Sequence, residues 1–420
     1  MILGLVSYPR DGACFAGNLK PLTILNISQN YHIRGGSDKI FLALGELLRS
    51  KGHQVIPLAA KSPDNLATEW DRFFPHAAKF EKPGPMDLLR FIYSLPAKRA
   101  VRRVIEEFHP DIAHLHIYYG KITASILAEL KGAGLPVVQT LHEYKLICPV
   151  YTLISNGQIC EACEGAHFWR ALPRRCNRGS LARTALSVLE SYVSHWLGAV
   201  DKVDKFIAVS DALRGKMIQH GIPPEKIITL RNWVDCDNVQ PSRQVGEYFL
   251  YFGRIERLKG IFSLIEAAAK IPANPLLIVG EGEAKEELVK LIRSKGYTHI
   301  KWLGFKKGAE LQDLIRRSIC TVIPSEWFEP FPMTVLESFS HARPAIGASI
   351  GGIPEIIEHG IDGFIFEPGD VDMLASYLTW MAEHPDQAVA MGSAGRNKVQ
   401  ERFSPDKYYQ DLMNIYNSVL

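Results

Sequence analysis

The sequence predicts an α/β fold of two doubly wound domains, each a parallel sheet with helices on both faces. Three observations support this prediction. Apolar, β-rich runs alternate with helical periodicity, the chain has 420 residues, and one polar stretch divides the alternation into halves. A strand–helix–strand rhythm is typical of parallel sheets covered by helices. A single core seldom grows beyond about 250 to 300 residues, so we expect two domains.

The first half contains six candidate strands. Between the first two, apolar residues recur at helical spacing from Ile40 to Leu48, and Lys51-Gly52 ends that helix. The strands are LTILNIS (22–28), HQVIPLA (53–59), DIAHLH (111–116), PVVQTLH (136–142), KFIAVS (205–210) and KIITLRN (226–232).

The second half repeats this rhythm after a polar stretch, 235–247, that contains Pro241 and is the expected linker. We therefore expect one domain over residues 1–240 and a second over 241–400. Ligands of such sheets bind at the carboxyl ends of the strands. The strands are FLYFGR (249–254), PLLIVGEG (275–282), IKWLGF (300–305), CTVIPS (320–325), PAIGAS (344–349) and GFIFEP (363–368).

Composition excludes several classes of protein. No apolar run reaches transmembrane length, and the chain starts without a basic leader, so neither a membrane span nor a signal peptide is expected. Seven cysteines without an export signal favour the reducing cytoplasm. Residues 1–240 carry 29 Lys and Arg against 22 Asp and Glu, which suggests an anionic partner. No basic block with interleaved aromatics is present, so nucleic acid is not expected.

The segment PSEWFEPFPMTVLE places Glu329 and Glu337 eight residues apart after an apolar strand. A proline suits the first turn of a helix there, which would leave the backbone N–H groups of Met333 and Thr334 available to a phosphate. The two carboxylates would accept hydrogen bonds from sugar hydroxyls. The alternative is a pair of solvated surface glutamates.

Two other loops could meet phosphate. GRIERLKG holds Arg254 and Lys259 after the first strand of the second domain, where two cations suit a diphosphate. YHIRGGSDK places Gly35 and Gly36 between a strand and a helix, where glycines allow close backbone approach. The alternative for each is an ordinary polar loop.

Taken together and in order, these motifs resemble a known family, the large retaining GT-B glycosyltransferases grouped as family four. The resemblance covers roughly residues 22–415 and implies two Rossmann-like domains facing a central cleft. It also implies that the first domain binds the acceptor, the second binds a nucleotide-sugar, and a helix over 401–420 packs back on the first. The matching elements are E-x7-E, GR…KG, GGIPEII…DGF…PGD (351–370), the N-terminal GG, GHQV (52–55), TLHE (140–143), AVS (208–210) and RNWVD (231–235).

The resemblance also implies roles for individual residues. Glu337 would hold the ribose, and Glu329 would face the hydroxyls of the transferred sugar. Arg254 and Lys259 would neutralise the diphosphate. Gly35 and Gly36 would lie next to the phosphate, and His142 next to the donor sugar. Gly282 and Phe305 would lie on the side of the base. Without the resemblance, His142 is more simply a buried structural histidine.

The implied activity is retaining transfer of a sugar from a UDP- or GDP-sugar to a glycan acceptor, expected to be lipid-linked. No covalent nucleophile is required, and no DxD-like motif precedes the site, so no catalytic metal or other cofactor is expected. The alternatives are a nucleotide-sugar epimerase, a synthase of a free disaccharide or its phosphate, and a non-catalytic sugar-nucleotide-binding protein. The intact Glu329, Glu337 and Lys259 argue against the last of these.

Four cysteines fall in an expected insertion near 143–180, with the spacing C-x11-C-x2-C-x12-C. Such spacing suits a structural zinc site, while free thiols, a disulfide and an iron–sulfur site remain open. The cysteines are Cys148, Cys160, Cys163 and Cys176.

Two basic runs, KRAVRR (98–103) and the arginines of 170–183, are either solvated helix faces or a patch that docks on anionic lipid. Phe168 and Trp169 lie beside the second run. We therefore expect a cytoplasmic protein with a peripheral position on the inner face of the membrane.

Overall fold

The computed structural model describes residues 20–79 and 83–420, which form two compact units. The N-terminal unit runs to Leu230 and takes in the last residues, Tyr409–Leu420, whereas the C-terminal unit spans Arg231–Tyr408. Residues 1–19, which open the predicted first domain and include the start judged not to be a signal peptide, lie outside the described part.

The N-terminal unit contains, among the described residues, a six-stranded parallel sheet in the order β2-β1-β3-β4-β7-β8. The first of its helices, α1, connects β1 to β2, as the periodicity predicts. Its strands are β1 (Thr23–Ile27), β2 (Gln54–Leu58), β3 (Ile112–Leu115), β4 (Val137–Leu141), β7 (Lys205–Ala208) and β8 (Ile227–Thr229). Its larger helices are α1 (Gly36–Ser50), α2 (Pro85–Ile92), α3 (Leu95–Phe108), α4 (Leu127–Gly132), α6 (Leu181–Trp196) and α7 (Asp211–Gln219).

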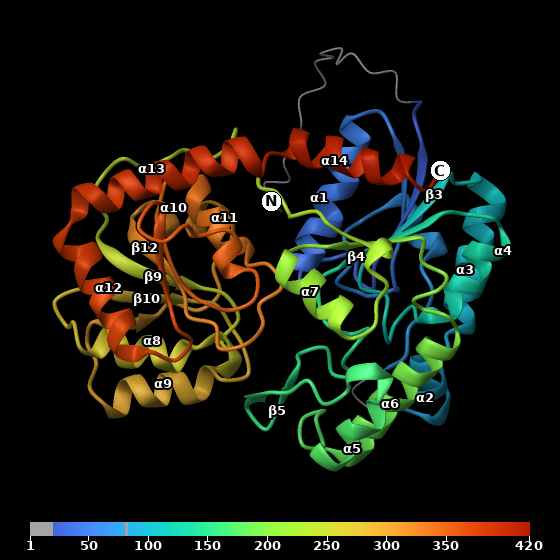
Figure 1. Cartoon of the computed structure of the whole chain (residues 1–420), viewed down its shortest axis with the longest axis horizontal. Coiled ribbons are helices and arrows are strands. Elements are labelled where there is room, and N and C mark those ends of the chain that lie inside the picture. Colours follow the sequence, from blue (N-terminus) through green and yellow to red (C-terminus); the bar gives the residue numbers. More distant parts are fainter. Residues whose placement is uncertain (1–19, 80–82) are drawn as a thin grey trace. The chain divides into compact units, whose positions relative to one another are not determined.

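The C-terminal unit repeats this arrangement with a second six-stranded parallel sheet, counted over the described residues, in the order β11-β10-β9-β12-β13-β14. Helices α8 and α9 lie along one side of the sheet, with α10 and α11 on the other (Figure 1). Its strands are β9 (Tyr248–Phe252), β10 (Leu276–Val279), β11 (Ile300–Trp302), β12 (Ser318–Ile323), β13 (Ala345–Ala348) and β14 (Gly363–Phe366). Its helices are α8 (Ile261–Ala269), α9 (Lys285–Ser294), α10 (Gly308–Arg316), α11 (Met333–Ser340), α12 (Val371–Glu383) and α13 (Pro385–Arg402).

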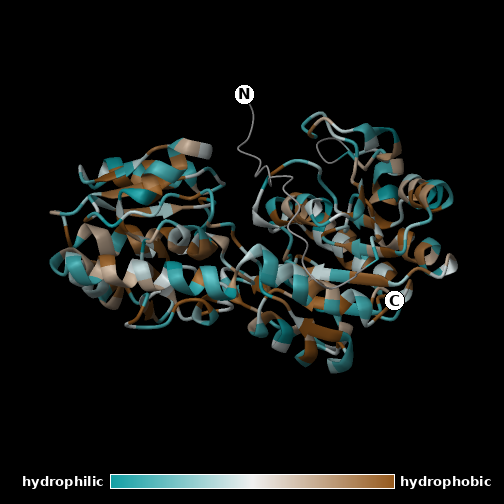
Figure 2. Ribbon diagram, turned by 90° about the horizontal axis from the view of Figure 1, so that it is seen from above, coloured by the Kyte–Doolittle hydropathy of each residue, from teal (hydrophilic) through white to brown (hydrophobic). Residues whose placement is uncertain are grey.

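Both sheets form the hydrophobic cores of their units. The strand residues are almost entirely buried, and hydrophobic residues concentrate on the strands and inner helix faces (Figure 2). This burial on both sides explains why the strands appear in the sequence as continuous apolar runs. Every one of the twelve predicted strands is present, and the prediction of two doubly wound α/β domains is confirmed.

The unit boundary precedes the predicted one at residue 240 because the RNWVD segment packs in the C-terminal unit. The Val234 N–H donates to the Phe403 carbonyl at 3.0 Å, and the rings of Trp233 and Tyr408 lie 4.0 Å apart. The final helix α14 (Pro405–Asn417) supplies Tyr416 to the N-terminal unit, where its hydroxyl lies 2.6 Å from His114 Nδ1.

Candidate active site

The loop after β12 carries Glu329 and leads into α11, whose second turn carries Glu337. Glu329 is buried, so it is not the solvated surface carboxylate of the alternative interpretation, whereas Glu337 is half-buried. Helix α11 begins at Met333, so Met333 and Thr334 occupy its first turn. The N–H groups of a first turn lack partners within the helix and can bind an anion.

Glu329 forms an ion pair with Lys259, a residue 70 positions earlier in the chain. Lys259 Nζ lies 2.5 Å from Glu329 Oε2, and only 17% of the lysine side chain is exposed. Lys259 ends the short 3-10 helix η6 (Arg257–Lys259) after β9, and β9 pairs with β12. The sheet order therefore brings the two predicted residues together.

Burial alone would raise the pKa of Glu329 because it disfavours the charged carboxylate. The charge and hydrogen bond of Lys259, the indole of Trp327 and the charge of Arg254 outweigh this effect and hold the pKa below its ordinary value. Glu329 is therefore ionised at neutral pH. A buried, ionised carboxylate can accept hydrogen bonds from sugar hydroxyls.

Glycines allow the loops of this site to touch through their backbones. Gly260 adopts φ +66°, and a Cβ there would lie 1.7 Å from the Pro324 carbonyl oxygen. Gly351 adopts φ +60°, and a Cβ there would lie 2.2 Å from the Glu329 carbonyl oxygen. The Gly352 N–H donates to the same Glu329 carbonyl at 2.8 Å. Glycine is therefore required where the GR…KG and GGIPE segments contact the glutamate loop.

Arg254 lies in the loop after β9 with 54% of its side chain exposed. Its Nη1 is 2.9 Å from Glu256 Oε1, and its carbonyl accepts a hydrogen bond from the Tyr251 hydroxyl at 2.7 Å. The backbone is thus fixed while the guanidinium faces solvent. An exposed guanidinium near Glu329 is available to a diphosphate.

The two residues predicted near the base also lie at this edge of the sheet. Gly282 follows β10, and a Cβ there would lie 2.3 Å from the Ile255 carbonyl oxygen in the loop after β9. Phe305 follows β11 and is 67% exposed. The predicted residues of the C-terminal unit thus follow the carboxyl ends of β9 to β12, where ligands of such sheets bind.

In the N-terminal unit, Gly35 is the residue before α1 and Gly36 is its first residue. The Asp38 carboxylate accepts hydrogen bonds from the N–H groups of Arg34 at 3.0 Å and Gly35 at 3.2 Å. Asp38 therefore uses one of the N–H groups that a ligand could have bound. Apart from Gly35 itself and its two chain neighbours, no heavy atom of the described residues lies within 4 Å of the place where a Gly35 Cβ would be.

His142 follows β4 and belongs to a stack of three imidazoles. Its Nε2 lies 2.9 Å from His116 Nδ1, and the His116 ring stacks on His114 at 4.6 Å. Burial lowers the pKa of His142 to about 4, so the ring is neutral near pH 7. His142 thus has the hydrogen-bonded, buried character of a structural histidine, at a strand end where the resemblance implies a donor-sugar contact.

The four cysteines lie near one another, and none of them forms a disulfide, around the short β-hairpin of β5 (Ile154–Ser155) and β6 (Gln158–Ile159). Burial and the three other cysteines raise the pKa of Cys163 to about 12, and Cys163 and Cys176 belong to one hydrophobic cluster. Within residues 20–79 and 83–420, however, no three His, Cys, Asp or Glu side chains are arranged to hold a metal ion. The zinc ion stays a prediction.

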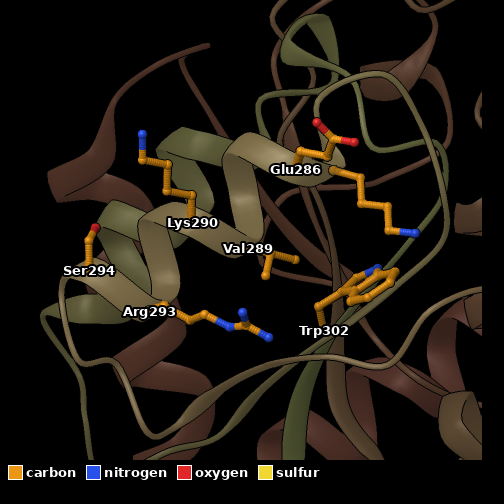
Figure 3. A pocket seen from close by; sticks show the side chains of 7 residues that line it. Glu286, Val289, Lys290, Arg293, Ser294 and Trp302 are labelled. Atoms are coloured by element: carbon orange, nitrogen blue, oxygen red, sulfur yellow. The ribbon is translucent and has the colours of Figure 1, made fainter.

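A separate cavity of about 600 Å³ lies between α9 and the edge strand β11. The side chains of Val289 and Arg293 point from α9 toward Trp302 (Figure 3). The Lys285 ammonium lies 4.5 Å from the centroid of the Trp302 ring. None of the residues predicted for the site lines this cavity, so it is not the candidate active site.

Known proteins share this sequence pattern across both units. Residues 34–238 match the family described as Glycosyltransferase Family 4, and residues 237–398 match the glycosyl transferases group 1. The chain belongs to the family-four GT-B glycosyltransferases. This confirms the resemblance inferred from the motifs.

Two relatives show how far the similarity extends. This glycosyltransferase is 23% identical to the N-acetyl-alpha-D-glucosaminyl L-malate synthase of Bacillus anthracis over 403 residues, which is 92% of this chain and 94% of that protein. It is 26% identical to the lipopolysaccharide 1,6-galactosyltransferase of Escherichia coli K12 over 226 residues, 52% of this chain and 62% of that one.

Among solved structures, Anabaena HepE in complex with UDP is similar with a TM-score of 0.68 and 19% identity. The similarity covers 94% of this chain and 100% of HepE. The same protein has been solved with UDP-glucose. At this level of identity, the similarity shows the shared fold.

Two neighbours of Glu329 were missed from the sequence. Trp327 and Ser325 both contact the Glu329 carboxylate. Trp327 lies two residues before Glu329, and Ser325 lies four residues before it. In a loop, neither spacing predicts that a side chain will contact the glutamate. The only indication was a tryptophan two residues before a predicted site residue.

Proposed function

We propose that this glycosyltransferase transfers a hexose from a UDP-sugar to a lipid-linked glycan acceptor with retention of the anomeric configuration. The observation that carries the proposal is the buried Lys259–Glu329 pair at the edge of the sheet where α11 begins. A cation, a carboxylate and a helix N-terminus are the groups that a diphosphate-linked sugar requires.

The first chemical requirement is to stabilise the leaving group. Negative charge grows on the diphosphate as the bond to the sugar breaks. In the proposal, Lys259, Arg254 and the N–H groups of Met333 and Thr334 stabilise this charge, and they are in place before the reaction begins. A preorganised cation accelerates the reaction most when it interacts more strongly with the transition state than with the ground state.

The second requirement is to hold the sugar. In the proposal, Glu329 accepts hydrogen bonds from hydroxyls of the transferred sugar, and Glu337 binds the ribose. Glu329 is already tied to Lys259, Trp327 and Ser325, which weakens it as a nucleophile. This supports same-face transfer, in which the departing phosphate takes the proton of the acceptor and no covalent intermediate forms.

The donor class is supported by the known proteins of this fold. HepE has been solved with UDP and with UDP-glucose, and the Escherichia coli relative is named as a galactosyltransferase. We therefore propose a UDP-hexose rather than a GDP-sugar as the donor.

The acceptor side is supported by a surface of the N-terminal unit. The helix α2 has no fully buried residue, and Met86 and Leu89 on it are 59% and 61% exposed. It packs against α6, where Trp196 is 73% exposed. Exposed apolar side chains with nearby cations suit an anionic bilayer surface. No helix of the described residues is long and apolar enough to span a bilayer.

The arginines near this surface are exposed, whereas two cations of the other basic run form ion pairs. Arg174, Arg175 and Arg178 are exposed in and after α5 (Ala171–Arg174), which packs on α6. In the other run, Lys98 and Arg102 both pair with Glu129, at 3.3 and 2.8 Å. We therefore propose that the arginines of 170–183 meet the lipid headgroups.

Release of nucleoside diphosphate tests the proposal. Purified protein should release UDP from one of UDP-glucose, UDP-galactose and UDP-N-acetylglucosamine faster when a lipid-linked glycan is added. The anomeric configuration of the product, measured by NMR, should match that of the donor. Release from GDP-mannose alone, an inverted product, or interconversion of donors without acceptor would each contradict it.

A further inference from the structure

The two oxygens of the Glu329 carboxylate have different surroundings. Among the described residues, three side chains donate to Oε2: the Lys259 ammonium at 2.5 Å, the Trp327 indole at 3.0 Å and the Ser325 hydroxyl at 3.3 Å. No described residue donates to Oε1. One oxygen is therefore fixed by the protein, and the other can accept a hydrogen bond from a ligand.

The backbone of Glu329 is also fixed. Its carbonyl accepts the Gly352 N–H at 2.8 Å, and Gly351 packs against the same peptide so closely that no Cβ would fit. The main chain therefore has little freedom to move. The side chain of Glu329 can still rotate, and its orientation is set by the hydrogen bonds that Oε2 accepts.

Trp327 is suited to fixing that rotation. It is only 7% exposed, so its indole N–H has a fixed direction. The Lys259 ammonium also lies 5.1 Å from the centroid of its ring, within reach of a cation–π interaction. Trp327 thus contacts both members of the ion pair and orients each toward the other.

We propose that Trp327 is a positioning residue that, with Ser325, holds Oε2 and so presents Oε1 of Glu329 to a hydroxyl of the donor sugar. The inference rests on the proposed function, since it takes the sugar of a UDP-hexose as the ligand of Glu329. Trp327 itself need not touch the donor. A buried donor with locked geometry preorganises a catalytic group in this way.

Electrostatics agree with this geometry. A hydrogen bond to a carboxylate favours its charged form, and the Trp327 indole is one of the causes that keep the pKa of Glu329 low. The other charged or titratable groups that face the carboxylate are Lys259, Arg254 and Tyr251. Loss of the indole N–H should therefore move the acidic limb of the kcat profile to higher pH.

The test compares Trp327→Phe with Trp380→Phe. Trp327→Phe keeps a ring under Lys259 and removes the N–H, whereas Trp380, on α12, lies outside the proposed site. With whichever UDP-sugar the wild type uses, Trp327→Phe should lower kcat about tenfold, the scale of one hydrogen bond to a charged group. UDP affinity, measured by calorimetry, should stay unchanged. Ser325→Ala, which removes a longer bond, should show a smaller loss in the same direction.

A double-mutant cycle separates positioning from general damage. In a Glu329→Gln background the acceptor of the indole is altered, so adding Trp327→Phe should cost much less than it does in the wild type. Equal kcat and equal pH profiles for Trp327→Phe and Trp380→Phe, in an active protein, would overturn the inference and leave the proposed function standing. Equal costs of Trp327→Phe in both backgrounds would also overturn it. Absence of wild-type turnover with every UDP-sugar would instead overturn the proposed function, and the inference with it.

Discussion

Lys259 Nζ and Glu329 Oε2 lie 2.5 Å apart in a largely buried ion pair. The two residues follow adjacent strands, β9 and β12, so the pair depends on the sheet and not on a local loop. Because both charges are largely withdrawn from water, each affects the other strongly, and the removal of either one should have measurable consequences.

Replacement of Lys259 by alanine should lower kcat by about 10² to 10³, the scale for loss of one preorganised donor to developing charge. Lys270→Ala is the matched control, since Lys270 pairs with Asp372 at the surface of the same unit. Steady-state kinetics of UDP release would check this. A Lys259→Ala protein with unchanged kcat and KM would show that the pair has no part in the reaction.

Substitution of the two glutamates should affect different kinetic parameters. Glu329→Gln should lose kcat while UDP still binds, because in the proposal this residue orients the reacting sugar. Glu337→Gln should mainly raise the donor KM, because a ribose contact is nearly equal in the ground and transition states. Donor KM, kcat and UDP affinity, measured for both variants, check this division. Full kcat in Glu329→Gln would remove that residue from the site.

Stability should depend on pH through the same pair. The pKa of Glu329 is held below its ordinary value in the folded protein, so its stabilising contribution is present above the unfolded pKa and is lost as pH falls through the folded pKa. Lys259→Ala leaves a buried carboxylate unpaired and should cost about 3 kcal/mol near pH 7. This cost should shrink as pH falls through the lowered pKa of Glu329 in the wild type, because below it the carboxyl group is protonated in both proteins.

Urea unfolding of the wild type and Lys259→Ala across this range measures the difference. Glu329→Gln serves as the control, because the added substitution Lys259→Ala should then cost nearly the same at every pH. A cost of Lys259→Ala that does not vary with pH in the presence of Glu329 would contradict the assigned electrostatics.

The cysteine spacing still predicts one structural zinc. Burial and then the three nearby cysteines raise the pKa of Cys163, and a bound cation would stabilise the thiolates that these effects disfavour. Purified protein should hold about one zinc per chain, and Cys160→Ser should lose both the metal and folded stability. Cys320→Ser, at a buried thiol of the other unit, is the control. A stable metal-free protein with four titratable thiols in this segment would show free cysteines instead.

The arginines of 170–183 should bind anionic vesicles. The combined variant Arg174→Gln, Arg175→Gln and Arg178→Gln should lower binding to vesicles of phosphatidylglycerol, and added salt should lower wild-type binding through screening. Activity on a water-soluble acceptor should be spared. The variant Lys98→Gln and Arg102→Gln, at cations already paired with Glu129, is the control. Equal binding to neutral vesicles would argue against the proposed surface.

Much of this protein follows from local sequence pattern. The strands were predictable because both faces of a parallel sheet are buried, so each strand is a continuous apolar run. The start of α11 was predictable to within one residue, because a proline is favoured at the beginning of a helix; Pro332 proves to be the N-cap before Met333 and not a residue of the first turn. The order of the motifs along the chain was enough to identify the family, because this order can be read from the sequence without knowing which residues are in contact.

Contacts between distant segments could be decided only by the tertiary structure. The order β9–β12 sets Lys259 against Glu329, and the loop path then puts Trp327 and Ser325 on the same carboxylate oxygen. Likewise, Trp233 packs against Tyr408 and moves the unit boundary ahead of the polar linker. Periodicity records which face of an element is buried, but not which loop will lie beside it. That choice is made by the packing of the whole sheet, and it determines which oxygen of Glu329 remains for a ligand.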